Sequence, residues 1–397
     1  MDVIVVGAGI GGLTAALTLA RAGLQVRVFE QAPALHEVGA GIQIAPNATR
    51  IFHRLGLAEA LARVGVRPER SDLRRWDDGR LLWSEPLGQA VVERFGAPYY
   101  HLYRPDLLAV LSDALPAGVL HLSHQVTGLA EHGDAVEVVL ANRARARADV
   151  VVGADGIHSV VRAAILGPES PRFSGSQAYR GLVPAERLAH LDLPRRFAVW
   201  LGTSRHFVHY YVAGGRFMNF VGVCPAGEWR LESWSARGEV ADALLEFSGW
   251  HPQVRAIIGA AVETHRWALY DREPLARWSA GRVTLLGDAA HAMLPFLAQG
   301  ACQAVEDAVV LARCLAEAEP ASVGPALTRY EEIRKPRASR IQRGSFENAT
   351  TYHLPDGPAQ QARDAGYAAL EREDAYAARG WLYDYDAEAA IRGTSAP

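Results

Sequence analysis

The chain has 397 residues, 49% of them hydrophobic and 21% charged, which is the composition of a globular protein with a sizeable core. Its length leaves room for two joined domains. Its 44 acidic and 41 basic residues give a net charge of −3, so neither nucleic acid nor an anionic membrane surface is indicated as a partner.

The cysteines and the N-terminus bear on where the protein works. Cys224, Cys302 and Cys314 form no C-x-x-C pair, which predicts buried thiols rather than a disulfide framework or a metal site. A strand begins at Asp2 with no basic stretch before it, and no apolar run reaches the roughly 18 residues of a membrane span. We therefore expect a cytoplasmic protein without a membrane partner, as a monomer or homodimer.

The first half of the chain opens with a βαβ unit. The apolar, β-branched run at 2–6 (DVIVV) predicts a buried parallel strand, followed by a helix over 11–22 and a strand over 25–30. Aromatic residues among turn residues at 72–100 predict strands of a different sheet. Three further elements are predicted before residue 155: a helix at 104–114, antiparallel strands at 118–140 around the Gly133-Asp134 turn, and a core strand at 149–154.

The second half is strand-rich and then helical. Residues 176–270 contain aromatic strand-like runs such as HFVHYYV and predict a mostly antiparallel second domain. The run RVTLL predicts a strand that leads into GDAA. Helices are predicted at 300–316, 325–345 and about 355–378, before a loop-like WLYDYD and a frayed end.

The N-terminal glycines have the pattern of a dinucleotide-binding loop. Gly7, Gly9 and Gly12 match G-x-G-x-x-G between a strand and a helix, and Glu30 ends the next strand. The first glycine permits the turn, the second admits a pyrophosphate and the third lets helix and strand pack closely. Glu30 can accept both hydroxyls of an adenosine ribose and opposes a 2′-phosphate, so the loop predicts an ADP-containing ligand rather than an empty glycine-rich turn.

A second cradle is predicted near residue 290. Gly287-Asp288 follows a strand, as suits an acid that binds a polyol such as ribitol, and Gly300-Ala301 begins a helix whose N–H groups can stabilise a flavin's anionic edge. Taken alone, Asp288 would be a simple helix cap. With the N-terminal loop, the pair predicts one long cofactor that lies across the domain.

Three motifs carry a resemblance to a known family: GAGIGG at 7–12, DVVVGADGIHSVVR at 149–162, and the run from Gly281 to Ala312. In their order and spacing the chain resembles the group A flavoprotein monooxygenases, the single-component FAD-dependent aromatic hydroxylases with the p-hydroxybenzoate hydroxylase fold. Within that family it is most similar to salicylate hydroxylase, 3-hydroxybenzoate 6-hydroxylase and 6-hydroxynicotinate 3-monooxygenase. One departure is Ala292, where the family usually has proline.

The resemblance implies an α/β fold: a Rossmann-type FAD-binding domain with an inserted, mostly antiparallel β-sheet substrate domain and a C-terminal helical segment. The expected division is 1–71, 101–175 and 271–345 for FAD, 72–100 and 176–270 for substrate, and 346–397 for the tail.

The resemblance also implies roles for single residues. Glu30 should bind the adenosine ribose and Asp288 the ribityl chain. Gln43 and Arg104 should contact FAD, Val126 should lie by the adenine, and Asp155 should be linked to both FAD and the nicotinamide dinucleotide. Pro295 should lie over the flavin near the substrate, and Gln299 should line the pocket. His291 looks like a base, but in this family it is usually structural.

The substrate side is predicted from residues 206–211. On a strand, His206, Val208 and Tyr210 share one face and Phe207, His209 and Tyr211 the other. Relatives show H-x-x-x-Y-P here, so His206 and Tyr210 are candidates for the substrate pocket, although ordinary aromatic sheet residues would give the same pattern. His209 is expected at the surface. Arg180, Arg216 and Tyr270 are alternative ligands for a substrate carboxylate.

The implied reaction is hydroxylation by a flavin C4a-hydroperoxide after NADH or NADPH reduces FAD, with O₂ and a small aromatic compound as substrates. An electrophilic oxygen needs an electron-rich ring, and a histidine suits deprotonation of a phenol, which favours His206 as the base. Salicylate, giving catechol, is the first candidate among small phenolic or N-heteroaromatic acids. The alternatives are a larger quinolone or polyketide aromatic, and a flavin oxidase or halogenase, whose W-x-W-x-I-P motif is absent.

Overall fold

A parallel sheet forms around the first strand of the chain. The computed structural model describes residues 1–35, 40–228, 236–369 and 376–393. Strand β1 pairs in parallel with β11 on one side and β2 on the other, and its apolar residues are buried on both faces, as its sequence predicts. Within these ranges the sheet has the order β18 (Ser279–Ala280), β19 (Val283–Leu285), β11 (Val150–Gly153), β1 (Asp2–Val6), β2 (Gln25–Phe29), β7 (Leu120–His121).

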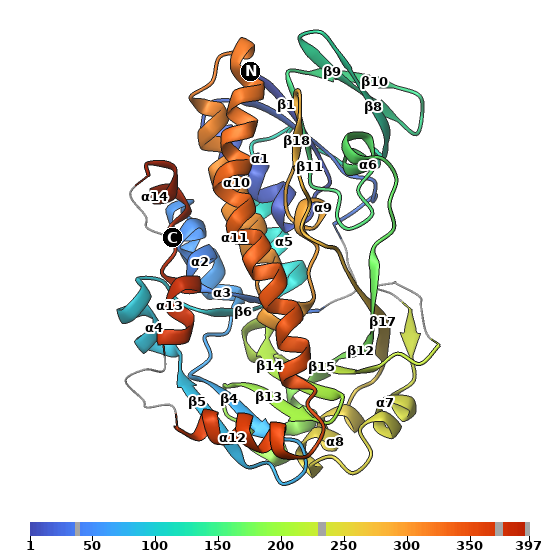
Figure 1. The fold of residues 1–397 in the computed structure, drawn as a ribbon, viewed down its shortest axis with the longest axis vertical. Helices are drawn as coiled ribbons and strands as arrows, with labels where there is room; N and C mark the ends of the chain where they lie inside the picture. The colour runs from blue at the N-terminus through green and yellow to red at the C-terminus, as the bar shows by residue number, and fades with distance from the viewer. Residues whose placement is uncertain (36–39, 229–235, 370–375, 394–397) are drawn as a thin grey trace.

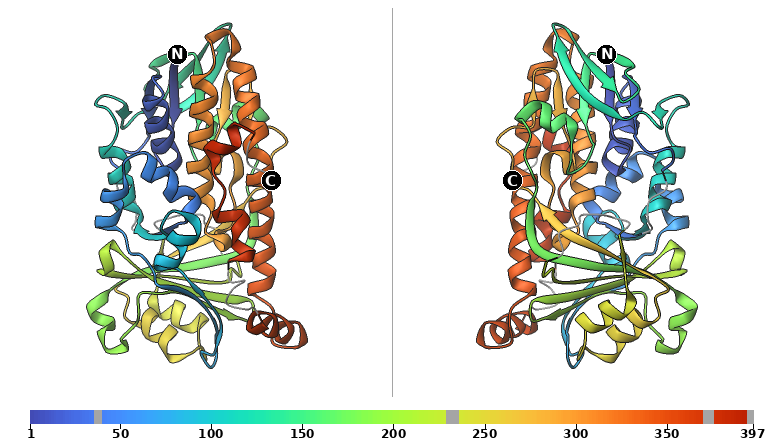
Figure 2. Two further views of the ribbon diagram at one scale, coloured as in Figure 1. Left: turned by 90° about the vertical axis from the view of Figure 1, so that its left-hand side faces the viewer. Right: turned by 90° about the vertical axis from the view of Figure 1, so that its right-hand side faces the viewer.

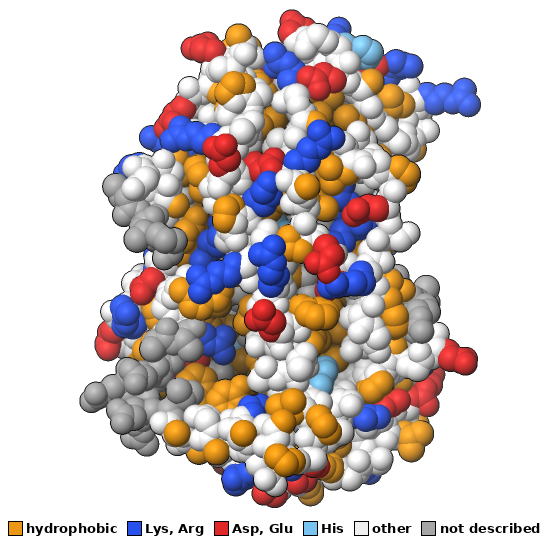
Figure 3. Space-filling model, viewed as in Figure 1, with side chains coloured by type: hydrophobic (Ala, Val, Ile, Leu, Met, Phe, Trp, Pro, Cys, Tyr) orange, Lys and Arg blue, Asp and Glu red, His pale blue; other side chains and the backbone are white. Residues whose placement is uncertain are grey.

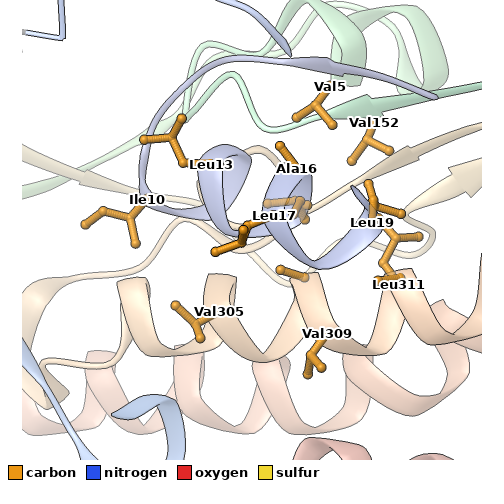
Figure 4. Packing of buried hydrophobic residues seen from close by; sticks show 14 of the residues in the cluster. Val5, Ile10, Leu13, Ala16, Leu17, Leu19, Val152, Val305, Val309 and Leu311 are labelled. Carbon is orange, nitrogen blue, oxygen red and sulfur yellow. The ribbon is translucent and has the colours of Figure 1, made fainter. Parts of the chain in front are cut away.

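Helix α1 (Ile10–Arg21) packs between this sheet and helix α10 (Gly300–Ala316). Figure 4 shows α1 between the strands that carry Val5 and Val152 and helix α10. Leu13 is fully buried there, which contributes about 1.5–3 kcal/mol. The Thr18 hydroxyl donates across the contact to the Ala308 carbonyl at 3.1 Å. Gly11 allows this close approach, since a Cβ there would lie 3.0 Å from the Cβ of Ala304 on α10.

Figure 1 shows the other helices both around this core and at the lower end of the molecule. In chain order the remaining helices of the described residues are α2 (Pro46–Arg54), α3 (Ala58–Val64), α4 (Gly88–Phe95), α5 (Arg104–Asp113), α6 (Val160–Leu166), α7 (Val240–Glu246), α8 (Pro252–Gly259), α9 (Asp288–His291), α11 (Val323–Tyr352), α12 (Pro358–Ala369), α13 (Ala377–Tyr383) and α14 (Ala387–Ile391).

A large second sheet lies below the parallel one (Figures 1 and 2). It is antiparallel except where β13 pairs in parallel with β4. In the part of the chain that the structure describes, its order is β16 (Arg237–Gly238), β17 (Thr264–Asp271), β12 (Arg172–Pro184), β15 (Phe217–Pro225), β14 (Arg205–Val212), β13 (Phe197–Gly202), β4 (Arg70–Arg75), β5 (Leu81–Pro86). The predicted α/β class with a mostly antiparallel second sheet is confirmed.

Two smaller sheets complete the strands. The predicted hairpin around Gly133 is confirmed, and its strands β8 (Val126–His132) and β9 (Ala135–Leu140) pair with β10 (Arg145–Ala148). Strands β3 (Gly41–Ile44) and β6 (Tyr100–Tyr103) pair with each other. Gly41 of β3 donates its N–H to Asn219 of the large sheet at 2.8 Å, so this short pair connects the two bodies.

The two faces of the large sheet have different neighbours. Phe207 and Trp200 are buried on the face that α7 and α8 cover, with Phe247 among them. His209 shares this face and is buried, so the prediction of a surface histidine is wrong. Helix α8, far along the chain, covers it: Gln253 Nε2 lies 3.4 Å from His209 Nε2. The opposite face of the sheet is turned to the parallel-sheet body.

The C-terminal part of the chain returns to the core. Helix α11 runs from beside α10 down to the large sheet (Figure 2), and the predicted helix at 325–345 is confirmed within it. The predicted loop at WLYDYD is wrong for its first three residues, because α13 continues through Tyr383, whereas residues 384–386 lie outside any helix. Arg337 of α11 donates to the carbonyls of Trp381 and Leu382 at 2.9 and 2.8 Å. Helix α12 confirms only part of the predicted helix at 355–378, in which residues 370–375 lie outside the described ranges.

The distribution of surface charge and the burial of the cysteines match what the composition predicts. Acidic and basic side chains are interspersed over the face in Figure 3. All three cysteines are free and buried, as predicted. Among the described residues, no helix combines the length and the apolar character that crossing a membrane requires.

Buried His209 makes stability depend on pH. Burial, and then nearby Arg74, lowers the pKa of His209 from 6.5 to about 3. Between pH 6.5 and pH 3, His209 binds a proton in the unfolded chain but not in the folded chain. The free energy of unfolding therefore falls as pH drops from 6.5 toward 3, by about 1.4 kcal/mol per pH unit for this group.

We expect His209→Gln to remove this contribution. The difference in unfolding free energy between pH 7.5 and pH 5, measured by urea unfolding, should shrink by about 2 kcal/mol. His190→Gln, at an exposed position, is the control and should change nothing. An unaltered pH dependence in His209→Gln would contradict this account.

Candidate active site

One cavity of about 450 Å³ lies between the parallel-sheet body and the open face of the large sheet. Both predicted cradles and the predicted substrate strand contribute to its wall. Of the residues expected at the site from sequence, those that line it are Gly9, Gln43, Arg104, His206, Tyr210, Gly287, Asp288, Pro295, Gln299, Gly300 and Ala301.

The three glycines of the N-terminal loop have two different roles. Gly7 has φ +100°, and a Cβ there would lie 2.5 Å from the Ala154 carbonyl oxygen. A Cβ on Gly12 would lie 2.0 Å from the Gly7 carbonyl oxygen. A Cβ on Gly9 would meet nothing within 4 Å. Gly7 and Gly12 therefore serve the fold, while Gly9 keeps the cavity wall open for a close ligand.

Two helices begin at the cavity without a side-chain cap. Helix α1 starts after Gly9 and α10 starts after Gln299, and neither residue caps the helix through its side chain. The first N–H groups of a helix lack intrahelical acceptors and carry partial positive charge. Gly300 leaves the start of α10 open, because a Cβ there would meet only Asp288 and Met293, at 3.9 and 4.0 Å. Both ends are suited to negatively charged or carbonyl oxygens.

Asp288 presents an acid to the cavity. It follows Gly287, whose φ of +59° turns the chain out of β19. Its side chain is exposed, yet to the cavity and not to the outer surface, and burial raises its pKa while His291 and Arg104 act against the rise. Among the described residues none donates a hydrogen bond to this carboxylate. It is therefore ready to accept hydrogen bonds from hydroxyl groups of a ligand.

Three residues expected to contact the cofactor lie outside the cavity lining. Glu30 accepts from the N–H groups of Ala8 and Ala32, at 2.7 and 2.8 Å, which places its carboxylate beside the glycine loop with further lone pairs available. Val126 is buried at the start of β8. Asp155 accepts from the N–H groups of Val160 and Val161 at 2.7 and 3.2 Å, so the structure uses its carboxylate at the start of α6.

His291 and Ala292 belong to the support of the site. His291 is fully buried, and its Nε2 lies 2.6 Å from Asp307 Oδ2. Ala292 stands where relatives usually have proline, and its carbonyl accepts from Gln342 at 3.1 Å and from the Arg272 N–H at 3.3 Å. These two hydrogen bonds hold the turn without the proline ring.

The floor of the cavity consists of rows of side chains that run across the large sheet. One row joins Tyr210 to Phe197, whose ring centroid lies 6.0 Å away, and continues through Ser71 to Glu85. A second row is mostly valine: Val199, Val208 and Val221, ending at Arg180. A third contains His206, Val223, Ala178 and Trp267. The predicted alternation along β14 therefore turns His206, Val208 and Tyr210 into the cavity.

The segment before α10 and the end of α11 close over His206. Phe296 contacts its ring edge-to-face with centroids 5.0 Å apart. His206 Nδ1 lies 2.7 Å from His353 Nε2. Gln299 is buried, and its amide oxygen accepts from Asn47 Nδ2 at 3.0 Å. His206 thus uses one ring nitrogen within the protein, and its other nitrogen remains for a ligand.

Of the three residues predicted as alternative ligands for a substrate carboxylate, two line the cavity and one does not. Arg180 and Tyr270 line the cavity, and the Arg180 guanidinium lies 5.5 Å from the centre of the Trp267 ring. Arg216 is absent from the lining, and its Nε donates to the Ala213 carbonyl at 3.0 Å.

Several cavity residues carry no signal in the sequence. At the end of the cavity beyond Tyr210 are Glu85, Tyr99, Tyr352, Arg379 and Tyr383. Tyr99 donates to Gln43 Oε1 at 2.6 Å. Their positions depend on strand pairing and on the return of the C-terminal segment, neither of which leaves a local pattern in the chain.

The cavity fits FAD. An open glycine at each helix start suits the pyrophosphate and the flavin edge, Glu30 lies by the loop for the ribose, and Asp288 faces the cavity for the ribityl hydroxyls. The chain belongs to the FAD binding domain family, whose model matches residues 1–345.

Similar proteins narrow the class. A 3-amino-4-hydroxybenzoate 2-monooxygenase of Streptomyces platensis is 47% identical over 383 residues, 96% of each chain. A 6-hydroxynicotinate 3-monooxygenase of Pseudomonas fluorescens is 40% identical and covers 87% of this chain and 90% of its own. A salicylate hydroxylase substrate complex is similar in structure, with a TM-score of 0.83, 28% identity and coverage of 100% and 98%. The protein is an FAD-dependent aromatic monooxygenase, as predicted.

The loop glycines allow a matched pair of substitutions. Gly9→Ala should fold normally but bind FAD at least about tenfold more weakly, since its methyl group enters the open space at the start of α1. Gly12→Ala should lower the melting temperature of the apoprotein, because the methyl group has no room beside Gly7. Melting curves and FAD titrations by fluorescence test both, and wild-type FAD affinity in Gly9→Ala would refute the assignment.

Proposed function

We propose that this monooxygenase hydroxylates a small benzoate that carries hydroxyl and amino groups, with 3-amino-4-hydroxybenzoate as the first candidate. The observation that carries the proposal is a single cavity in which the FAD cradle, Pro295 and the His206–Tyr210 wall meet. The 47% identity over 96% of both chains to a monooxygenase of that name supports this acid. We further propose NADH or NADPH as the reductant and O₂ as the second substrate.

His206 is the proposed base toward the substrate hydroxyl. Burial, and then the proximity of His353, holds the pKa of His206 well below its ordinary value, so the ring is neutral at neutral pH. A neutral His206 that donates its Nδ1 hydrogen to His353 presents Nε2 as an acceptor. Burial lowers the pKa of His353 to about 4, so this ring is also neutral at neutral pH. Because His353 is partly exposed, it can pass a proton from His206 to solvent.

The other residues of the floor orient the ring and exclude water. Burial raises the pKa of Tyr210, which therefore stays a hydroxyl and can donate to the substrate. Val208, Val221 and Phe296 form an apolar wall in which water has few partners. FAD, when bound, supplies the reducing equivalents and the activated oxygen. Arg180 and Tyr270 are the proposed partners of the substrate carboxylate.

Salicylate remains a second candidate, supported by the structural similarity to a salicylate hydroxylase. A larger aromatic is the third. One assay distinguishes the three candidate substrates, because only the true substrate accelerates flavin reduction and couples it to oxygen transfer.

The assay compares 3-amino-4-hydroxybenzoate, salicylate, 6-hydroxynicotinate and a quinolone as stimulants of NADH and NADPH oxidation, with O₂ uptake and peroxide measured together. We expect the first acid to give the highest kcat/KM, the least peroxide, and a product heavier by one oxygen atom. Tight coupling with salicylate instead would replace the proposed substrate. If no acid stimulates oxidation, the proposed function fails.

The histidine pair is tested through pH profiles. His206→Asn should lower kcat roughly 100-fold, as expected for loss of a general base. His353→Gln should retain most of kcat but move the acid limb of kcat/KM to higher pH. The shift has this sign because His353 helps to keep the pKa of His206 low, and only neutral His206 accepts a proton. His190→Asn is the control, and an unmoved acid limb in His353→Gln would exclude the coupling.

A further inference from the structure

We propose that Glu85 is the acceptor for an amino substituent on the aromatic acid, with Arg379 as its counter-ion. The inference rests on the proposed function and deepens it, since it assigns the group that would select an amino-substituted ring. Neither residue is singled out by any pattern in the sequence.

Glu85 is a buried acid without a hydrogen bond. Its side chain is 2% exposed, and Oε1 is fully buried with no partner. The nearest cation is Arg379, whose Nε lies 3.7 Å from Oε2, beyond hydrogen-bonding distance. No residue of the described ranges donates to either oxygen. Folded proteins rarely leave a buried carboxylate without a hydrogen-bond donor, so we infer that a ligand supplies the donor to Glu85.

Glu85 also lines the cavity and is placed to reach a substrate. It lies in the same row as Ser71, Phe197 and Tyr210, on strands β5, β4, β13 and β14. Three strand spacings separate the backbones of Glu85 and Tyr210 by about 14 Å. Both side chains line the same cavity, with Ser71 and Phe197 between them in the row.

The charges at this end favour an N–H donor over a carboxylate. Glu85 and Arg379 neutralise each other, and the other polar side chains near Arg379 are tyrosines: Tyr99, Tyr352 and Tyr383. Burial raises the pKa of Tyr352 to about 12, so it adds no charge. A substrate carboxylate here would face an acid that is already present, whereas Arg180 offers a cation at the other end of the floor.

An amino group bound to Glu85 also serves the reaction. A neutral aromatic amine donates electron density to the ring carbon beside it, and the relative's name puts the new oxygen beside the amino group. A hydrogen bond from the amine N–H to an anionic oxygen strengthens that donation. Glu85 would therefore both select the substrate and enrich the carbon that is attacked.

The test uses two pairs of ligands and an isosteric variant. For turnover, 3-amino-4-hydroxybenzoate is compared with 4-hydroxybenzoate; for binding, 3-aminobenzoate is compared with benzoate by titration of the bound-flavin absorbance. Wild type should favour the amino compound of each pair roughly 10- to 100-fold, the range of a hydrogen bond to a charged group. Glu85→Gln should remove most of this preference. For the compounds without an amino group, its kcat/KM and Kd should stay within about threefold of the wild-type values.

Glu93→Gln is the matched control, because Glu93 is an exposed acid on α4 and its loss changes the net charge equally. Because Glu85→Gln leaves Arg379 without its counter-ion, the melting temperature of each variant is measured, and ligand preferences are compared at a temperature at which all variants are folded.

Three outcomes overturn the inference: a preference that survives in Glu85→Gln, no preference in wild type, or an equal loss for both members of a pair, which would mean that Glu85 supports the cavity as a whole. Failure of wild type to hydroxylate either acid would refute the proposed function, and the binding pair would still decide the role of Glu85.

Discussion

A buried cluster of two acids and two arginines fixes the geometry on which the cavity depends. Glu306 and Asp307 are consecutive on α10 and fully buried, and Arg334 of α11 donates to them at 2.6 and 2.8 Å. Arg337 adds a bond to Glu306 at 2.8 Å. Burial alone would raise the pKa of Glu306, but the two arginines hold it below its usual value. Because the four charges balance, loss of one would leave a buried charge unpaired, at a cost of about 3–5 kcal/mol.

The cluster reaches three separate parts of the cavity wall. Asp307 accepts the Gly287 N–H at 3.0 Å and so sets the turn that presents Asp288. Glu306 accepts from Asn47, which also donates to Gln299 at the start of α10. Arg337 holds the carbonyls that begin the last turn of α13, and this helix carries Arg379. The turn at Asp288, the start of α10 and the far end of the cavity thus share one support.

The features that could be predicted from the sequence are those that depend on residues close together along the chain. The glycine loop, Glu30 and the strand before Asp288 have local spacing, and the period of two along β14 was enough to put His206 and Tyr210 on one face. Contacts between distant segments were not predictable: His353 lies 147 residues from His206, and Arg379 meets Glu85 across most of the chain.

The errors have the same origin. His209 was assigned to the surface because the alternation along β14 does not reveal that α8 covers the second face. The prediction of a loop from Trp381 onward misses the last turn of α13. The carbonyls of that turn accept hydrogen bonds from Arg337 of a different helix, and such a contact leaves no local pattern in the sequence.

The C-terminal residues of the cavity are synthesised after all the others. The residues of the FAD cradle end at Ala301, and the family match ends at residue 345, whereas His353, Arg379 and Tyr383 come later. During synthesis on the ribosome, a nascent chain has therefore acquired every part of the cradle, and the strand of His206 and Tyr210, before it acquires these C-terminal residues. Changes in the last fifty residues can therefore alter the end of the cavity at Glu85 and Arg379 without touching the residues of the proposed FAD cradle.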